Sequence, residues 1–377
     1  MTAQTDRVVI VGAGVVGLAT AYFLGKAGVQ TTVIERDSIG SHASGFAYGG
    51  LSAVSGTGVE PALEALAFDG MRLHREFGSS LEEQTGIDTG YGDKALLSLA
   101  FYEKEAVAAR AAVERQQHHQ DYSVCWLDGP ETRTLEPRIS EEALGGIYVE
   151  GSTQVDPYRF NLALAQAAEK LGATIRHGSV TGLDRQGDQV AGVEIGDETI
   201  PCEYVVIAMG PWSAEAGEWL GFPVNVGPLK GQIIRLRAPG PPFECSLGWD
   251  GNYATTKPDG LVWAGTTEEE VGFDETPTVQ ARESITAALS RMVPSLKNAK
   301  LVRQTACLRP ITPDRLPVLG PAPGVEGVFM ATGAERKGIL LGPSMGRVAA
   351  DIIVTGTSDI AIDAFDPDRF SGDNVGC

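Results

Sequence analysis

Basic residues are scarce in this chain. Its 377 residues include 30 Lys and Arg against 49 Asp and Glu, and the formal net charge is −19. Proteins that bind nucleic acids gather Lys and Arg on one surface to neutralise the phosphates, and no long basic run occurs here. The composition therefore argues against a nucleic-acid partner and is typical of a soluble protein.

Cysteines are few and scattered. They form no C-x-x-C pair and have no histidine at the spacing of metal ligands. We therefore expect no disulfide framework and no metal site, and a reducing cytoplasm is the expected location. The five cysteines are Cys125, Cys202, Cys245, Cys307 and Cys377.

Histidine is missing from the second half of the chain. The segment Gly342–Gly346 reads G-x-S-x-G, which is the nucleophile-elbow pattern of serine hydrolases. That mechanism needs an acid and then a histidine after the serine, whereas no histidine follows His177. A serine hydrolase is thereby excluded.

No clear membrane span or targeting signal is evident. The apolar stretch Val8–Leu24 is at the lower edge of the length that crosses a bilayer. It contains three glycines at a fixed spacing and lacks both a basic region before it and a cleavage site of small residues. We interpret it as a strand and a helix of a folded core.

The same stretch carries a pattern typical of dinucleotide binding. Arg7–Val11 is apolar and rich in β-branched residues, which predicts a buried parallel strand. Gly12, Gly14 and Gly17 then match G-x-G-x-x-G: the first permits a tight turn, the second lets the backbone reach a pyrophosphate, and the third lets helix and strand pack closely. Glu35 ends the next predicted strand, where a carboxylate suits ribose hydroxyls and argues against NADP. The unit predicts a dinucleotide and leaves FAD or NAD open.

The rest of the chain predicts an interrupted α/β fold. Helical patterns and short strands alternate up to Gly210, whereas residues 231–265 read as the short strands of an antiparallel sheet. After Pro321 the α/β texture returns, with a strand at 328–331 and a helix from about Pro343 to Thr355. The simplest architecture is a nucleotide-binding domain interrupted by a second domain with a large antiparallel or mixed sheet.

Stretches along nearly the whole chain carry a family resemblance. Besides the N-terminal turn they are Ala43–Gly45, Asp156–Arg159, Ala208–Ser213, Pro228–Gln232, Leu308–Pro310 and Arg336–Pro343. In their order and spacing they resemble the FAD-dependent D-amino-acid oxidase and dehydrogenase family. The pattern is closest to glycine oxidase and is related to sarcosine oxidase.

The resemblance implies FAD as the cofactor and a Rossmann-like FAD-binding domain. That domain is expected to comprise residues 1–80, 150–220 and 320–377, and the substrate-binding domain residues 81–149 and 221–319.

The cofactor-binding residues follow from the turn and the resemblance together. By analogy with the family, Val180 is expected on a strand whose backbone faces the adenine. The segment Gly338–Pro343 is expected to lead into a helix whose N-terminus faces the flavin. The full set is Gly12, Gly14, Gly17, Glu35, Arg36, Ala43, Ser44, Gly49, Val180, Gly210, Trp212, Arg309, Gly333, Gly338, Ile339 and Leu340.

The resemblance also implies the substrate site. Arg309 matches the arginine that binds the substrate carboxylate, and its planar fork suits a bidentate contact; it is expected in a polar turn after an apolar strand. Arg336 and Tyr253 match further substrate-site positions. The implied reaction is oxidation of the C–N bond of glycine, sarcosine or a D-amino acid, with hydride transfer to flavin N5 and hydrolysis of the imine to an oxo acid.

The sequence departs from the family at two positions. Ala334 and Glu335 follow Gly333 where relatives often have a histidine, which opens the option of a substrate with a basic side chain. Trp263 lies near the position of the oxygen-activating lysine of sarcosine oxidases, so that route to oxygen is not supported.

Several alternatives stay open. Cys307 falls near the cysteine that binds flavin covalently in sarcosine oxidases, whereas glycine-oxidase-like relatives with the Leu308–Pro310 pattern bind FAD without a covalent link. A flavin monooxygenase is a second reading, although Ala331–Gly333 stands in place of its Gly-Asp motif, and a non-catalytic nucleotide-binding protein is a third. The exact substrate and its chirality, oxygen or a quinone as electron acceptor, and the oligomeric state are also open.

Overall fold

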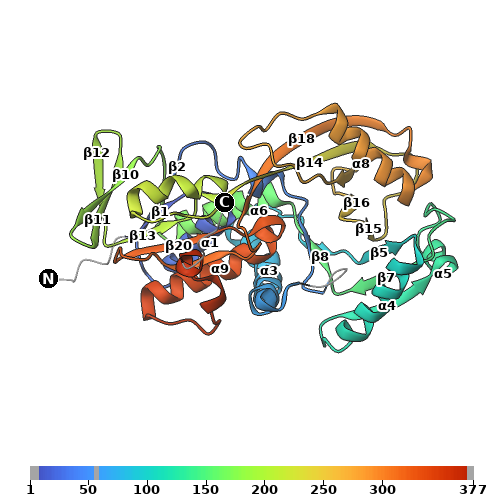
Figure 1. Ribbon diagram of the computed structural model, residues 1–377, viewed down its shortest axis with the longest axis horizontal. Coiled ribbons are helices and arrows are strands. Elements are labelled where there is room, and N and C mark those ends of the chain that lie inside the picture. Colours follow the sequence, from blue (N-terminus) through green and yellow to red (C-terminus); the bar gives the residue numbers. More distant parts are fainter. Residues whose placement is uncertain (1–7, 55–58, 372–377) are drawn as a thin grey trace.

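Two large β-sheets organise the protein. The computed structural model describes residues 8–54 and 59–371. Figure 1 shows the smaller sheet, around β1 and β13, in one half of the molecule and the larger one, around β14 and β16, in the other. The G-x-G-x-x-G turn belongs to the smaller sheet, and the segments that read as antiparallel strands belong to the larger one.

The smaller sheet has six strands and is parallel except at one edge. Its strands, in spatial order, are β19 (Val318–Pro321), β20 (Val328–Thr332), β13 (Tyr204–Ile207), β1 (Val8–Val11), β2 (Thr31–Glu35) and β9 (Thr174–His177). Only β19 runs antiparallel to its neighbour. The central strands are almost continuously buried, as expected where both faces of a parallel sheet are covered.

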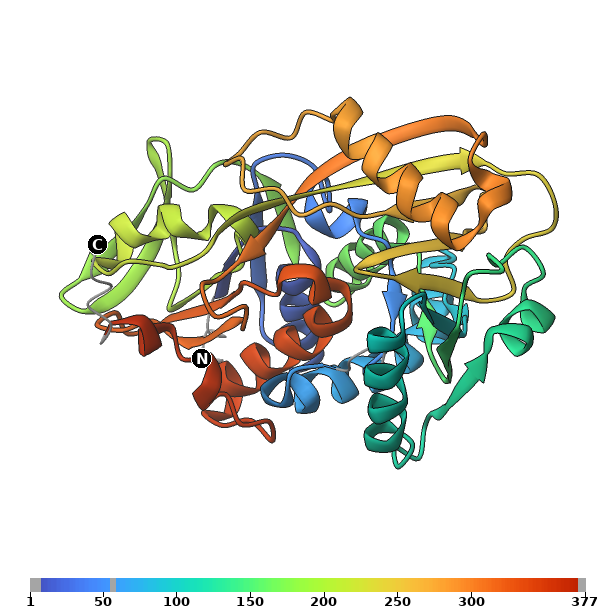
Figure 2. The same cartoon turned by 45° about the vertical axis from the view of Figure 1, so that its right-hand side comes forward.

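Four long helices accompany this sheet: α1 (Val15–Lys26), α3 (Glu64–Thr85), α6 (Pro157–Lys170) and α9 (Gly338–Thr355). Helix α1 packs against both α6 and α9, and α3 packs against α9. Figure 2 shows α3, in blue, beside α9, in red. Because α1 is enclosed by neighbours, most of its residues are buried and it lacks a polar face.

The larger sheet has eight mostly antiparallel strands. In spatial order they are β18 (Lys300–Ile311), β14 (Gly227–Arg237), β17 (Val262–Gly265), β16 (Asn252–Thr256), β15 (Ser246–Trp249), β5 (Leu96–Ala100), β7 (Gly145–Glu150) and β6 (Ser123–Asp128). Helix α8 (Val279–Met292) packs against its central strands, and α4 (Glu103–Gln116) against β5, β6 and β7. The strands β15 and β5 are the parallel pair in this sheet.

Short elements complete the fold. Gly196 and Asp197 form the turn between β11 and β12, which join β10 in a three-stranded sheet. The remaining strands and helices are β10 (Gly182–Gln186), β11 (Gln189–Ile195), β12 (Glu198–Pro201), β3 (Gly50–Leu51), β4 (Gly92–Asp93), β8 (Thr153–Gln154), α2 (Ala43–Phe46), α5 (Gly129–Leu135), α7 (Gly217–Leu220), η1 (Pro61–Leu63), η2 (Gly210–Ala216), η3 (Pro294–Leu296), η4 (Glu335–Lys337), η5 (Asp363–Phe365) and η6 (Pro367–Phe370).

Three local predictions were wrong. Helix α9 begins at Gly338 rather than near Pro343, because a proline removes only one N–H from a helix and tertiary contacts support the turn before it. Arg309 lies inside the long strand β18, where pairing with β14 continues past it, and not in a turn. Val180 lies in the loop between β9 and β10 rather than on a strand.

Helix α9 and the turn before it form a long apolar segment. The segment Glu335–Thr355 is long and apolar enough to cross a bilayer, but 61% of its most apolar window is buried inside the protein. Its contacts with α1 and α3 account for that burial. We interpret α9 as a core helix.

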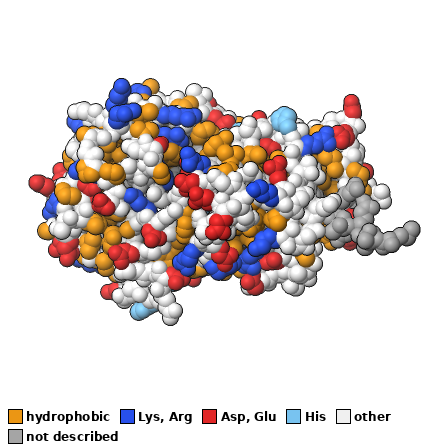
Figure 3. Space-filling model, turned by 180° about the vertical axis from the view of Figure 1, so that it is seen from behind, with side chains coloured by type: hydrophobic (Ala, Val, Ile, Leu, Met, Phe, Trp, Pro, Cys, Tyr) orange, Lys and Arg blue, Asp and Glu red, His pale blue; other side chains and the backbone are white. Residues whose placement is uncertain are grey.

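On the face drawn in Figure 3, acidic and basic side chains are intermixed with apolar ones.

Candidate active site

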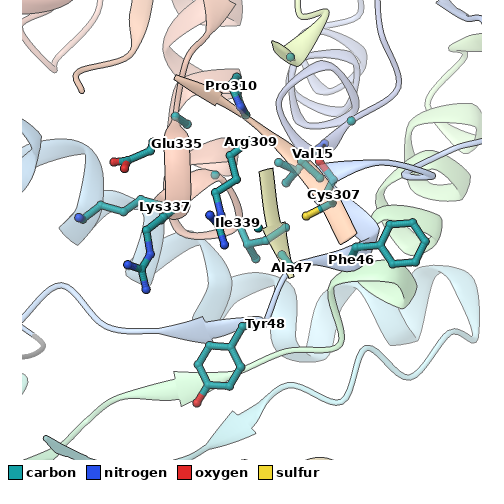
Figure 4. Close-up of a pocket in the computed structure, with 18 of the residues that line it drawn as sticks. Val15, Phe46, Ala47, Tyr48, Cys307, Arg309, Pro310, Glu335, Lys337 and Ile339 are labelled. Atoms are coloured by element: carbon teal, nitrogen blue, oxygen red, sulfur yellow. Dashed lines mark hydrogen bonds between the residues drawn. The ribbon is translucent and has the colours of Figure 1, made fainter. Parts of the chain in front are cut away.

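A large pocket connects the two sheets. Its volume is about 880 Å³, and its wall runs from the turn after β1 to the pocket face of β14, β16 and β18. Figure 4 shows Arg309 and Cys307 projecting from β18 toward the pocket, with Tyr48 on the opposite side. With the exception of Gly17, every residue predicted to contact cofactor or substrate lines this one pocket.

The glycine-rich turn forms one end of the pocket. Gly12 has a φ of +108°, and a Cβ atom there would lie 2.4 Å from the carbonyl oxygen of Ala208. A Cβ on Gly17 would lie 2.0 Å from the Gly12 oxygen, so Gly17 lets α1 sit against the turn and does not reach the pocket wall. Gly14 faces the pocket, and the N–H of Val15 is already held by the Ser44 hydroxyl at 3.0 Å.

The carboxylate of Glu35 is fixed beside this turn. One oxygen accepts a hydrogen bond from the N–H of Ala13 at 2.8 Å, and the other accepts from the N–H of Asp37 at 2.9 Å. Each carboxylate oxygen keeps acceptor capacity for a ligand hydroxyl. Nearby, the guanidinium of Arg36 lies 4.2 Å above the Trp212 ring, and both residues belong to the wall.

The other predicted cofactor residues come from loops and helix starts. They share small side chains or backbone that faces the pocket, so a ligand can approach the main chain closely. The first turn of α9 contributes the residues after Lys337. This group comprises Ala43, Ser44, Gly49, Val180, Gly210, Gly333, Gly338, Ile339 and Leu340.

Arg309 occupies the other end of the pocket. Its Nη1 donates to the carbonyl of Thr267 at 3.0 Å and its Nη2 to the hydroxyl of Thr266 at 2.6 Å. Within the described part of the chain no carboxylate forms an ion pair with Arg309, since Glu268 nearby pairs with other arginines. A held cation without an anionic partner is suited to an anionic ligand.

Gly231 provides the space for this guanidinium. It lies on β14 opposite Cys307, and a Cβ atom there would meet Nη2 of Arg309 at 2.0 Å. We expect Gly231→Ala to displace the guanidinium and raise KM several-fold for any anionic substrate that Arg309 binds. The melting temperature should change little, because the obstructing atom ends a long side chain and the backbone of Gly231 is ordinary strand. Steady-state kinetics and a thermal melt check both parts; an unchanged KM would contradict the expectation.

Tyr253 forms an aromatic pair with Tyr48, a residue that was not predicted for the site. Its ring stacks on Tyr48 at a centroid distance of 3.9 Å and an interplanar angle of 26°. Removal of water from the hydroxyl raises the pKa of Tyr253, and burial raises the pKa of Tyr48 to about 12. Both phenols are therefore protonated at neutral pH and can donate a hydrogen bond. No local pattern marks Tyr48, because it comes from the loop after α2.

Arg336 belongs to a network of charges in the pocket wall. Its Nη1 pairs with Glu268 at 3.0 Å, and its Nη2 donates to the carbonyl of Gly251 at 2.8 Å. Arg315 joins the network through Glu335 at 2.5 Å and Glu268 at 3.4 Å. Arg336 is thus less free than Arg309 to bind a substrate. The Glu335 carboxylate is already neutralised by Arg315, which weakens the case for a substrate with a basic side chain.

Cys307 lines the pocket and Trp263 does not, although both were compared with positions of sarcosine oxidases. Cys307 lies two residues before Arg309 on the same face of β18 and lines the pocket. Burial raises the pKa of its thiol. Trp263 is buried outside the pocket wall, where the guanidinium of Arg235 lies 3.7 Å from its ring centre. Over residues 8–54 and 59–371, no cluster of His, Cys, Asp and Glu is arranged to hold a metal ion.

A glycine turn at a helix start, a fixed acid on the second strand and a pocket that ends at an arginine define a dinucleotide-dependent α/β protein. The family model described as "FAD dependent oxidoreductase" matches residues 7–352, and the chain belongs to this family. It is an FAD-dependent oxidoreductase that oxidises the C–N bond of an amino acid or amine.

Curated relatives and solved structures agree on the family. Glycine oxidase from Geobacillus kaustophilus (strain HTA426) is 33% identical over 94% of each chain, and glycine oxidase from Pseudomonas aeruginosa (strain PAO1) is 31% identical over 93% of this chain and 95% of that one. The crystal structure of glycine oxidase from Geobacillus kaustophilus superposes with a TM-score of 0.91, at 31% identity over 97% of this chain and 99% of that chain. The predicted fold class and family are confirmed.

Proposed function

We propose that the enzyme binds a small amino acid or secondary amine of the glycine, sarcosine or D-amino-acid type through its carboxylate at Arg309. The observation that carries this proposal is the guanidinium held in the pocket by Thr266 and Thr267 without a carboxylate partner among the described residues. In this proposal Tyr253, which lines the same pocket, donates a hydrogen bond to the substrate, and Arg336 assists from the charged network.

FAD fits the remainder of the pocket. The side-chain-free cradle at Gly12 and Gly14 suits a pyrophosphate, and the fixed Glu35 carboxylate suits ribose hydroxyls. The first turn of α9 offers N–H groups where the flavin ring needs hydrogen-bond donors. When bound, FAD supplies the acceptor for the hydride from the substrate carbon, and water then hydrolyses the imine to an oxo acid and an amine.

We propose that FAD is bound without a covalent link. A thiol attacks as its thiolate, and burial raises the pKa of Cys307 and so keeps the thiol protonated at neutral pH. Acid precipitation should therefore leave the flavin in the supernatant.

We propose the predicted domain division as well: an FAD-binding domain of residues 1–80, 150–220 and 320–377 and a substrate-binding domain of residues 81–149 and 221–319. Sheet membership supports this division, since the strands of each large sheet fall within the residues of one proposed domain to within two residues.

We propose a soluble, cytoplasmic protein because α9 is largely buried and the composition is acidic.

The first test is spectroscopic. The purified protein should show a flavin absorbance spectrum, and anaerobic addition of glycine, sarcosine or one member of a D-amino-acid panel should bleach it. Reoxidation by air or by a quinone then identifies the acceptor, for which we propose oxygen or a quinone. A colourless protein that takes up no FAD would overturn the proposal. Bleaching by none of these amines would remove the proposed substrate class.

A further inference from the structure

Helix α9 contains a proline after its first turn, and this proline leaves one carbonyl without its usual partner. In an α-helix the N–H of residue i donates to the carbonyl of residue i−4. Pro343 has no N–H, so the carbonyl of Ile339 receives no such bond. Ile339 belongs to the part of α9 that lines the pocket. A buried carbonyl without a donor is costly, so a replacement is expected.

His74 on α3 supplies the replacement. Its Nε2 lies 2.7 Å from the Ile339 oxygen, and the side chain is 1% exposed. A carbonyl can only accept, so Nε2 must carry the hydrogen and Nδ1 is the unprotonated nitrogen. Nδ1 has no hydrogen-bond partner among the described residues. Burial lowers the pKa of His74 to about 4, so the ring is neutral at physiological pH.

The surrounding contacts hold α3 tightly against the start of α9. A Cβ on Gly70 would lie 2.2 Å from the Leu340 carbonyl oxygen, so only glycine allows this approach. One turn further along α9, the hydroxyl of Ser344 donates to Asp69 at 2.7 Å. The His74 ring also packs on Phe160 of α6 at a centroid distance of 4.7 Å. The view in Figure 2 shows the two helices side by side.

We propose that His74 is a positioning residue for the cofactor: by donating Nε2–H to the Ile339 carbonyl, it sets the orientation of the α9 turn that faces the pocket. This inference rests on the proposed placement of FAD at the start of α9. Leu340 and Ile339 come from this turn, and the unpaired N–H groups at a helix start point along its axis. If the Ile339 carbonyl loses its donor, the turn must rotate to find another, and those N–H groups move with it.

The test compares FAD affinity with stability in matched variants. His74→Leu fills the site without a donor, His74→Asn offers an amide one bond too short, and His74→Gln places an amide N–H near the position of Nε2. Ser344→Ala removes the neighbouring bond between α3 and α9 and leaves the Ile339 carbonyl untouched. FAD is removed from each variant, the dissociation constant is measured by titration of flavin fluorescence, and urea unfolding of the apoprotein gives its stability.

We expect the dissociation constant for FAD to rise at least about tenfold in His74→Leu and His74→Asn. To bind FAD, these variants must return the turn to an orientation in which the Ile339 carbonyl has no donor. A buried carbonyl without a donor costs about 1.4 kcal/mol, which is tenfold in affinity. His74→Gln should stay within about threefold of the wild type. Ser344→Ala should lower stability and leave FAD affinity unchanged.

Three results would overturn the inference: unchanged FAD affinity in a folded His74→Leu or His74→Asn variant, an equal loss of affinity in Ser344→Ala, or no rescue by His74→Gln. A wild-type protein that binds no FAD would instead overturn the cofactor placement itself. The two failures are therefore distinguishable.

Discussion

Replacement of Arg309 by methionine is expected to raise KM for the amino acid substrate by roughly 10- to 150-fold, because a hydrogen bond to a charged group contributes about 1.5–3 kcal/mol. Methionine keeps an unbranched stem of similar length and removes the charge. In the proposed site the substrate carboxylate is bound equally in the ground state and the transition state, so kcat should fall much less than kcat/KM. Steady-state kinetics with the amine that bleaches the flavin measures both constants.

A matched control lies on the same strand. Arg303 occupies the exposed beginning of β18, outside the pocket wall, so Arg303→Met should leave KM unchanged. Arg309→Lys should recover only part of the loss, since an ammonium cannot make the two parallel contacts of a guanidinium. If Arg309→Met bound the amino acid as the wild type does, the carboxylate would have another partner, and Arg336 would be the next residue to test.

The nucleotide end of the site could be predicted because its signals are local. The end of β2 at Glu35 was predicted correctly, and β1 was predicted over all its described residues. Gly17 owes its identity to a contact within one strand–turn–helix unit, with the Gly12 oxygen, and Gly12 owes its identity to its positive φ in the same turn and to the approach of Ala208. Only the approach of Ala208 comes from a distant segment.

The substrate end could be predicted only through the family resemblance. Tyr48, Glu268 and Arg315 come from three segments that tertiary folding brings to one wall, and no periodicity or spacing marks them. Arg309 was found, but its setting was not: pairing with β14 extends β18 through Pro310, where the local sequence reads as a turn. The start of α9 was misplaced for a similar reason, since the donor that compensates for Pro343 lies 265 residues from Ile339 along the chain.

The burial of His74 leads us to expect a specific loss of stability in acid. The pKa of His74 is lowered by burial from 6.5 to about 4 in the folded protein, so the unfolded chain takes up its proton first as the pH falls. The neutral ring therefore contributes its full stability above pH 6.5, and this contribution is lost progressively as the pH drops toward 4. By linkage, 1.36 kcal/mol per unit over that window amounts to about 3 kcal/mol. Urea unfolding of the apoprotein between pH 7 and pH 4 measures it.

The comparison with His74→Gln isolates the contribution of this one ring. Glutamine does not titrate, so the free energy of unfolding of the variant should fall more slowly with acid, and the difference between the two proteins should change by about 3 kcal/mol across the window. Asp274, whose pKa is lowered from 3.8 to about 2 by hydrogen bonds to Thr276, acts in a lower pH range and is common to both proteins. Parallel pH curves would mean that His74 keeps its ordinary pKa in the folded state and that its ring reaches water. The acid curve thus tests the burial of the ring that makes this contact, without any dependence on the cofactor.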